Sequence, residues 1–347
     1  MGRQATTAGR SPSAVLITDT NVAEHYLDPV VGSLRAAGLA VETVVLPAGE
    51  ASKTLETAGR LYDRMLAAGL DRGSVAVGLG GGVMTDLAGF VAATYMRGIA
   101  WVAVSTSLLG QVDASVGGKT GVDHPECKNL IGAFHQPSAV LADVATLATL
   151  PAEELRTGLA EVVKHAMIRD AHLMARLEAD ADALLACDPG VTEAVVARNI
   201  EIKAEVVAAD EREGGLRRIL NYGHTVGHAI ESLAMATGGR LADMPLTHGR
   251  AVALGMVAEA RIAERRGLLA PDAARRQRTL LDRFGLPVEL DQPLDSDRVL
   301  TLMRHDKKAE AGRLRFVLPE AVGSVCQRDD VTDDEIRDAL ALLARGD

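Results

Sequence analysis

The sequence has few of the residues that mark several common protein classes. Only three cysteines occur in 347 residues, at scattered spacings, which argues against a disulfide framework or a CxxC metal site and favours a reducing cytoplasm. Aromatic residues make up 3%, so stacking platforms for nucleic-acid bases are not expected. A formal net charge of −10 leaves no general basic surface, which disfavours partnership with nucleic acid or anionic membranes.

Long apolar runs are also missing. The nearest candidate, Gly98 to Val112, is interrupted by hydroxyl and amide side chains, so no membrane span is predicted. The first residues are small, polar or charged and do not form a secretory signal. We expect residues 1–13 to be a disordered tail and the protein to be cytoplasmic.

The length, by contrast, predicts two domains. Short β-branched runs alternate with helical patterns up to about residue 145, which indicates an α/β domain with a parallel sheet. Candidate strands are Ala14–Thr18, Val41–Leu46, Ser74–Leu79, Ile99–Ser105 and Ala139–Ala142, with helices at Thr54–Leu70 and Leu87–Met96. We expect this nucleotide-binding domain over residues 14–150, and a mostly helical domain over residues 151–347.

The second domain is predicted from helical periodicity that begins at Pro151. Expected helices are Glu153–Arg169, His172–Ala186, Val191–Ala209, His224–Met235, Arg250–Arg266, Asp272–Phe284 and Asp333–Arg345, with one late strand at Arg313–Leu318. In such an arrangement the natural ligand cleft lies between the domains.

A glycine-rich turn follows the third candidate strand. Gly80, Gly81 and Gly82 precede a helix, so the backbone can approach a phosphate while the helix amino terminus supplies N–H donors. The spacing is not GxGxxG, and a tight turn with Asp86 as helix N-cap explains the segment equally well. A later run, Gly117 to Gly121, is similar to a P-loop but has Asp113 where the first glycine belongs, so an ATPase is disfavoured.

Histidines and one carboxylate suggest a metal site. His224 and His228 lie one turn apart on a predicted helix, and His248 precedes the next one. Glu161 interrupts an apolar stripe, where burial without a partner is costly. Glu161 with two histidines would form an open three-ligand site of the catalytic zinc type; His165 is a rival ligand, although we favour a helix-surface position for it.

Several ordered motifs together resemble the 3-dehydroquinate synthase family of the sugar phosphate cyclases. They are Gly81–Gly98, Gln111–Gly121, Lys128–Pro137, Glu161–Lys164, Leu216–His228 and Asp306–Lys308. The resemblance implies conversion of 3-deoxy-D-arabino-heptulosonate 7-phosphate to 3-dehydroquinate and phosphate. It implies transient oxidation by NAD, phosphate elimination, re-reduction and intramolecular aldol cyclisation, with a divalent metal, usually Zn²⁺ or alternatively Co²⁺, in a homodimer.

The resemblance also implies roles for individual residues. The implied metal ligands are Glu161, His224 and His248. The implied NAD site comprises Asp19, Asn21, Glu50, Lys53, Gly81, Gly82, Val83, Asp86, Thr106 and Ser107. The implied substrate and catalytic residues are Asp113, Lys119, Asn129, Lys164, Lys203, Arg217, Asn221, His228 and Lys307 or Lys308, with Arg97 reaching the phosphate across the dimer interface. Compared with the family, the segment 234–245 before His248 is longer, and Arg250 replaces a common acidic residue.

Other functions remain open on sequence alone. The substrate of an amino-dehydroquinate synthase carries the carboxylate that Arg217 and Asn221 are expected to bind, whereas the substrates of valiolone-forming and deoxy-inosose cyclases lack it. The motif Ser115–Gly121 disfavours the deoxy-inosose type. A metal-dependent polyol dehydrogenase is disfavoured by the many cations near the motifs. A non-catalytic NAD-binding protein would have a broken ligand set, and all three ligands are present.

Overall fold

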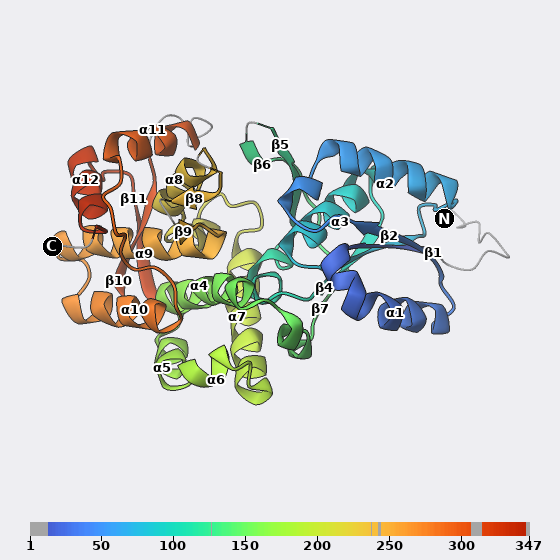
Figure 1. The fold of residues 1–347 in the computed structure, drawn as a ribbon, viewed down its shortest axis with the longest axis horizontal. Helices are drawn as coiled ribbons and strands as arrows, with labels where there is room; N and C mark the ends of the chain where they lie inside the picture. The colour runs from blue at the N-terminus through green and yellow to red at the C-terminus, as the bar shows by residue number, and fades with distance from the viewer. Residues whose placement is uncertain (1–12, 126, 237, 242–243, 307–313, 345–347) are drawn as a thin grey trace. The chain divides into compact units, whose positions relative to one another are not determined.

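The computed structural model of the chain describes residues 13–125, 127–236, 238–241, 244–306 and 314–344. It forms two compact units, residues 1–143 and 144–347 (Figure 1). The expected tail lies almost wholly outside the described residues. The short helix η4, Val144–Thr149, belongs to the second unit because it packs on a helix there, so the division precedes Pro151. Among the described residues, no helix is long and apolar enough to cross a membrane.

The first unit contains a five-stranded parallel sheet in the order β2-β1-β3-β4-β7. The strands are β1 Ser13–Asp19, β2 Ala40–Leu46, β3 Val75–Gly80, β4 Ala100–Ser105 and β7 Ala139–Ala142. All five match expected strands to within one residue at each end. Because parallel strands end at one edge of the sheet, Asp19, Gly80 and Ser105 lie at the same edge, where ligands of open α/β sheets bind.

Both faces of this sheet are covered. One face packs on α2, Leu55–Ala67, and α3, Gly82–Thr94, through buried residues such as Leu61 and Leu87. The other face packs on α1, Thr20–Ala36, through Leu16 and Val31. This two-sided burial explains why the strands are continuous apolar runs rather than alternating patterns. The sequence analysis missed α1, which contains Pro29 and has Val31 as its one fully buried residue among those described.

The P-loop-like run forms a different structure. Lys119–His124 is strand β5, which pairs antiparallel with β6, Cys127–Phe134. Gly117 and Gly118 have φ of 103° and 65°, so they form a turn that leads into the hairpin and not into a helix. The strand-loop-helix context that a P-loop requires is therefore missing, in agreement with the expectation that the run is not one.

The second unit is mainly helical. Its helices are α4 Ala152–Arg169, α5 Ala171–Ala179, α6 Ala181–Leu185, α7 Pro189–Ala209, α8 His224–Met235, α9 His248–Arg265, α10 Pro271–Arg283, α11 Ser296–Asp306 and α12 Asp333–Ala341. Short pairs of strands are β8 Arg240–Leu241 with β9 Met244–Pro245, and β10 Phe316–Ala321 with β11 Ser324–Arg328. The expected helix His172–Ala186 is divided at Asp180, and α11 and β11 were not expected.

Helix α9 is the centre of this unit and contacts α4, α8, α10 and α12. Glycines allow the two closest crossings. A Cβ on Gly255 would lie 1.9 Å from the Gly223 carbonyl oxygen at the start of α8, and a Cβ on Gly249 would lie 2.4 Å from Thr157 Cα in α4. Small residues at these crossings therefore set the spacing of the three helices α4, α8 and α9.

The segment 234–245 before His248, which we expect to be longer than in the family, contains the β8-β9 pair, and its residues 237, 242 and 243 lie outside the described part. Arg250, the departure from the family pattern, donates from Nη2 to Glu153 Oε2 at 2.7 Å. It therefore joins the first turns of α9 and α4. Arg250 is thus paired with a carboxylate, at a position where the resemblance leads us to expect an acidic residue.

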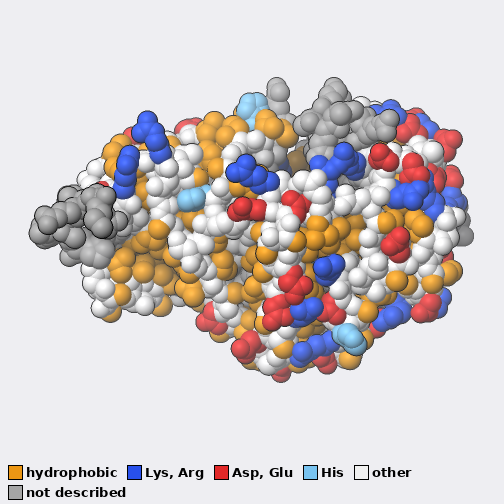
Figure 2. Space-filling view, turned by 180° about the vertical axis from the view of Figure 1, so that it is seen from behind, with side chains coloured by type: hydrophobic (Ala, Val, Ile, Leu, Met, Phe, Trp, Pro, Cys, Tyr) orange, Lys and Arg blue, Asp and Glu red, His pale blue; other side chains and the backbone are white. Residues whose placement is uncertain are grey.

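Charged pairs also join elements of the second unit, and acidic and basic side chains are interspersed on the face shown in Figure 2. Arg266, just after α9, donates from Nε and Nη2 to the two carboxylate oxygens of Glu335 in α12 at 2.6 and 2.7 Å. This bidentate hydrogen bond lowers the pKa of Glu335 to about 2.

We expect Arg266→Met to reduce the free energy of unfolding by about 1 kcal/mol at neutral pH, a value discounted for partial solvent exposure of the pair. Because the folded-state pKa of Glu335 is depressed, this contribution is present above the ordinary pKa of 4.5 and is lost as the pH falls towards about 2. Denaturant titrations at neutral and acid pH measure it. Arg275→Met, which removes an exposed pair with Asp272, is the matched control and should change nothing at either pH. A constant difference across the pH range would contradict the assignment.

Candidate metal centre and nucleotide-binding turn

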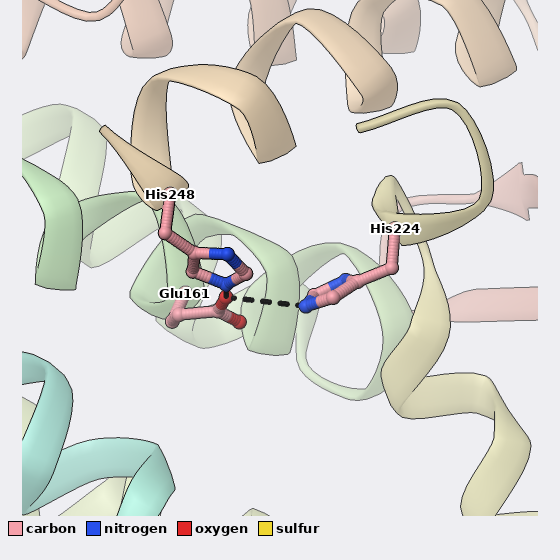
Figure 3. Close-up of side chains that lie close together, drawn as sticks. All are labelled: Glu161, His224 and His248. Atoms are coloured by element: carbon pink, nitrogen blue, oxygen red, sulfur yellow. Dashed lines mark ion pairs between the residues drawn. The ribbon is translucent and has the colours of Figure 1, made fainter. Parts of the chain in front are cut away.

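Three side chains from three helices meet in the second unit (Figure 3). Glu161 comes from the middle of α4, His224 from the first position of α8 and His248 from the first position of α9. Glu161 Oε1 lies 3.5 Å from His224 Nε2 and 3.3 Å from His248 Nε2. One ligand atom from each residue lies within 4.8 Å of the others, a grouping that can hold a metal ion.

Glu161 is the most buried member of this cluster, with 0% of its surface exposed. Burial would raise the pKa of its carboxyl group, but Lys164, which pairs with Oε2, and His224 outweigh burial and hold that pKa well below its usual range. Neither carboxylate oxygen accepts a well-aligned hydrogen bond from the described residues. An anionic carboxylate with unused acceptor capacity, facing two imidazoles, fits a divalent cation.

The two imidazoles differ in charge. Burial lowers the pKa of His224 to about 4, despite the opposing effect of Glu161. Burial would also lower the pKa of His248, but its close contacts with the Glu161 and Glu231 carboxylates outweigh burial and raise that pKa to about 10. The raised pKa favours a proton on His248 when no cation is bound, and a cation at Nε2 would compete with that proton.

His228 lies beside the cluster without belonging to it. Its ring centroid is 5.1 Å from that of His224 and 6.0 Å from that of His248. His228 follows His224 by one helical turn, which places both rings on the same face of α8. The ring is therefore close enough to contact a molecule bound at the cluster.

The surface position favoured for His165 is wrong. His165 is fully buried in α4, and its Nδ1 lies 3.0 Å from Oδ1 of Asn199 in α7. One turn after Glu161 on a helix that is buried nearly all round, it faces α7 instead of solvent. Among the described residues it is not part of the metal-type cluster.

Three of the cations expected to bind substrate are buried in the second unit. Lys164, Lys203 and Arg217 have exposed fractions of 1%, 6% and 1%. Arg217 Nη1 donates to the Glu211 carbonyl oxygen at 2.5 Å, and Asn221 Nδ2 donates to Glu213 Oε1 at 2.7 Å. Lys307 and Lys308 lie outside the described residues. Lys164 pairs with the Glu161 carboxylate, so part of this buried positive charge is compensated within the protein.

The glycine-rich turn of the first unit connects β3 to α3. Helix α3 begins at Gly82, earlier than expected, and no side chain caps it at Gly81. Asp86 lies inside the helix, so its alternative interpretation as N-cap is wrong. A Cβ on Gly81 would lie 3.1 Å from Ser107 Oγ, and one on Gly82 would lie 3.2 Å from Ala114 Cβ. Backbone N–H groups of Gly82 and Val83 thus start a helix whose amino terminus suits a phosphate.

Other residues expected at the NAD site gather at the same edge of the sheet. The Thr106 N–H donates to the Gly80 carbonyl oxygen at 3.0 Å, which holds the ends of β3 and β4 together. Asp19 caps α1 by accepting from the N–H groups of Asn21 and Val22 at 2.9 and 3.1 Å. Asp19 therefore has a structural role beside the glycine turn, whatever else it binds.

Lys53 joins two expected sites. Its Nζ donates to Asp86 Oδ2 at 2.6 Å and also to Asn129 Oδ1 in β6, while Glu50 Oε1 lies 3.9 Å away. Burial would lower the pKa of Lys53, but Asp86 outweighs it and raises that pKa. Asn129 was expected near the substrate and the other three near NAD. The structure brings Lys53, Asp86 and Asn129 into one hydrogen-bonded cluster, with Glu50 at ion-pair distance from Lys53.

Three further expected residues of the first unit lie on other elements. Asp113 lies in the π-turn Gly110–Ala114, and Lys119 is exposed at the start of β5. Arg97 is exposed and has a φ of 67°, next to Met96 with a φ of 50°. Two consecutive non-glycine residues in the left-handed region are strained, and such strain is typical of functional loops.

Two carboxylates of the second unit were missed by the sequence analysis. Glu231 Oε2 lies 3.1 Å from His248 Nδ1, and Glu259 Oε2 accepts from the Gly223 N–H at the start of α8 at 2.7 Å. Glu259 is fully buried in an apolar stretch of α9, the same signal that singled out Glu161. Glu231 follows His228 by three residues, so helical spacing also places it on the histidine face.

Comparison with known proteins identifies the family. The chain matches the N-terminal domain of 3-dehydroquinate synthase over residues 43–157 and the C-terminal domain over residues 158–309. The chain belongs to the 3-dehydroquinate synthase family. A 3-dehydroquinate synthase of Symbiobacterium thermophilum is 51% identical over 96% of this chain and 91% of its own.

Solved structures of sugar phosphate cyclases are similar across the whole fold. A 2-epi-5-epi-valiolone synthase from Streptomyces hygroscopicus, with NAD⁺ and Zn²⁺ bound, has a TM-score of 0.88 and 32% identity, covering 96% of this chain and 91% of that one. A 2-deoxy-scyllo-inosose synthase, complexed with carbaglucose-6-phosphate, NAD⁺ and Co²⁺, has a TM-score of 0.84 and 28% identity over the same shares. The α/β unit followed by a helical unit is thus the fold of this superfamily.

Proposed function

We propose that the chain is a 3-dehydroquinate synthase, converting 3-deoxy-D-arabino-heptulosonate 7-phosphate to 3-dehydroquinate and phosphate. The observation that carries the proposal is the cluster of the buried Glu161 with His224 and His248 in a chain 51% identical to a 3-dehydroquinate synthase. An amino-dehydroquinate synthase is the second candidate, because its substrate keeps the carboxylate that the buried Arg217 could bind.

Glu161, His224 and His248 would hold one divalent metal ion, Zn²⁺ or Co²⁺. Bound there, the ion supplies a Lewis acid that acidifies and orients a substrate hydroxyl. Both histidines present Nε2 to the centre, since their Nδ1 atoms are engaged elsewhere. Lys164, paired with Glu161 and 1% exposed, keeps a positive charge beside the hydroxyl that reacts.

NAD would bind at the carboxyl edge of the first unit's sheet. The start of α3 at Gly81, Gly82 and Val83 supplies N–H donors for the pyrophosphate. Glu50, Lys53 and Asp86 would line the NAD site, together with Asp19, Asn21, Thr106 and Ser107. The cofactor supplies reversible hydride transfer, while these residues fix its position.

The substrate would be held by cationic and polar side chains around its carboxylate and phosphate groups. Arg217 and Asn221 bind the carboxylate, and Lys203, His228, Asn129, Lys119, Asp113 and Lys307 or Lys308 surround the sugar and phosphate. Held in place by these side chains, the departing phosphate can accept the C–H proton that is removed during the elimination. Arg97 would complete the phosphate site from a second copy in a homodimer. We assign NAD binding to residues 14–150 and metal and substrate binding to residues 151–347, a boundary seven residues after the one between the two compact units. We assign the protein to the cytoplasm.

The reaction should require NAD⁺ without consuming it. Incubation of the metal-loaded protein with NAD⁺ and the heptulosonate phosphate should release phosphate over many turnovers while NADH does not accumulate. Parallel assays of phosphate and of NADH absorbance measure both. Stoichiometric NADH would instead indicate a polyol dehydrogenase, and no phosphate release with any phosphorylated sugar acid would refute the proposal.

The heptulosonate phosphate should be preferred to sedoheptulose 7-phosphate by at least about tenfold in kcat/KM. A charge-assisted hydrogen bond from Arg217 to the carboxylate is worth about 1.5–3 kcal/mol, and sedoheptulose phosphate has no such carboxylate. Arg217→Ala should remove most of this preference. Equal or reversed values for the unmodified chain would move the assignment to a valiolone-forming cyclase; the aminated heptulosonate phosphate in the same assay tests the second candidate.

A further inference from the structure

His248 lies between two carboxylates. On one side its Nε2 is 3.3 Å from Glu161 Oε1, and on the other its Nδ1 is 3.1 Å from Glu231 Oε2. Glu231 comes from α8 and His248 from α9, so the contact crosses the helix pair that Gly255 brings together. The Glu231 side chain is 13% exposed, which limits competition from water.

The contact fixes which nitrogen of His248 can bind a metal. An ionised carboxylate only accepts hydrogen bonds, so Nδ1 must carry the hydrogen that it donates to Glu231. Nε2 is then the ligating atom, and it is the atom that faces Glu161. Glu231 therefore sets both the tautomer and the ring orientation.

His224 has the same arrangement with a neutral partner. Its Nδ1 lies 3.1 Å from the Tyr222 carbonyl oxygen, which also only accepts, and its Nε2 faces Glu161. The two histidines thus differ in the charge of the group behind them. A carboxylate donates more electron density through the imidazole than a carbonyl does, which makes the ligating nitrogen more basic.

We propose that Glu231 is a positioning residue that orients His248 and strengthens it as a metal ligand. The proposal rests on the proposed metal role of Glu161, His224 and His248. Residues that act on a ligand in this way typically change metal affinity by about 10- to 100-fold when they are removed. Removing Glu231 should weaken metal binding more than any substitution next to Nδ1 of His224, because the partner of that nitrogen is a main-chain carbonyl group.

Two substitutions separate orientation from charge. Glu231→Gln keeps the shape and an oxygen acceptor for Nδ1–H but removes the charge, whereas Glu231→Leu removes both. We expect Co²⁺ affinity, measured by competition with a chromophoric chelator, to fall by about 10- to 100-fold in Glu231→Leu and by less in Glu231→Gln. Glu264→Gln, which breaks an ion pair with Arg261 elsewhere on α9, is the matched control and should bind as the unmodified chain does.

The visible absorption of bound Co²⁺ is the second readout. Reorientation of His248 should shift the d–d bands of Glu231→Leu and leave those of Glu231→Gln close to the original, a pattern that a purely structural role would not produce. If Glu231→Leu does not fold, weaker Co²⁺ binding by Glu231→Gln still decides the question. Unchanged affinity and spectrum in Glu231→Gln and Glu231→Leu would overturn this inference, whereas failure of the unmodified chain to bind Co²⁺ would overturn the metal site itself.

Discussion

Removing the divalent metal ion with a chelator will reduce turnover of the heptulosonate phosphate by at least about 1,000-fold, and Zn²⁺ or Co²⁺ will restore it. Lewis-acid stabilisation of a developing alkoxide is worth several kcal/mol, which corresponds to losses of this size. Steady-state phosphate release before and after chelation, and after each metal is added back, measures the effect.

The same experiment contains its own controls. Mg²⁺ prefers an all-oxygen octahedron, so it should not replace Zn²⁺ at a site with two imidazoles. His248→Ala should lose tight binding of Zn²⁺ while the NAD⁺ affinity of the protein stays unchanged, because the glycine turn belongs to the other unit. Full activity in the presence of excess chelator, or undiminished zinc affinity in His248→Ala, would show that the ligand assignment is wrong.

Gly255→Ala will destabilise the second unit severely and abolish metal binding. The added Cβ would lie 1.9 Å from the Gly223 carbonyl oxygen and 2.8 Å from the Gly227 nitrogen, both backbone atoms that cannot rotate away. Overpacking of a tight core typically lowers the free energy of unfolding by about 1–3 kcal/mol. A clash with rigid backbone should lower it by an amount at or above the upper end of that range. The helices must separate, so His224 and His248 move apart.

Thermal unfolding and zinc titration of Gly255→Ala measure the two effects together. Gly190→Ala in α7 is the matched control, because its Cβ would approach the described residues no closer than 3.6 Å from Asp188 Oδ1. Alanine is a better helix former than glycine, so the control should be neutral or stabilised by up to about 1 kcal/mol. A Gly255→Ala protein with normal stability and zinc affinity would show that the α8-α9 crossing tolerates a wider spacing.

The sequence predicted two kinds of element well. These are helices that bury one face, and strands or helices that are buried on all sides. Strands such as β7 and helices such as α8 were placed with the correct ends, because buried apolar runs and helical periodicity are read directly from residue order. The three proposed ligands also carried a local signal, since Glu161 interrupts an apolar stripe and His224 begins a helix. Their meeting at one point depends on tertiary packing that no local pattern contains.

The misses have identifiable physical causes. Helix α1 contains Pro29 and buries little, so its periodicity is weak. The β5-β6 hairpin is glycine-rich and has exposed residues such as Leu130, 63% exposed, which hides the alternation expected of a strand. His165 looked like a surface residue because its partner Asn199 is 34 residues away in another helix. Such partners become visible only when the helices are packed.

The origin of the three ligands in α4, α8 and α9 has a consequence for folding. A bound ion would cross-link residues that are separated by 63 and 24 positions in the chain, which a protein with three unpaired cysteines does not achieve with disulfides. Because the unfolded chain holds no preformed site, binding would favour the folded state by about 2.7 kcal/mol at a free metal concentration 100 times the Kd. The ion would thus act as a reversible cross-link between the three helices, and metal starvation would lower the stability of the second unit as well as its activity.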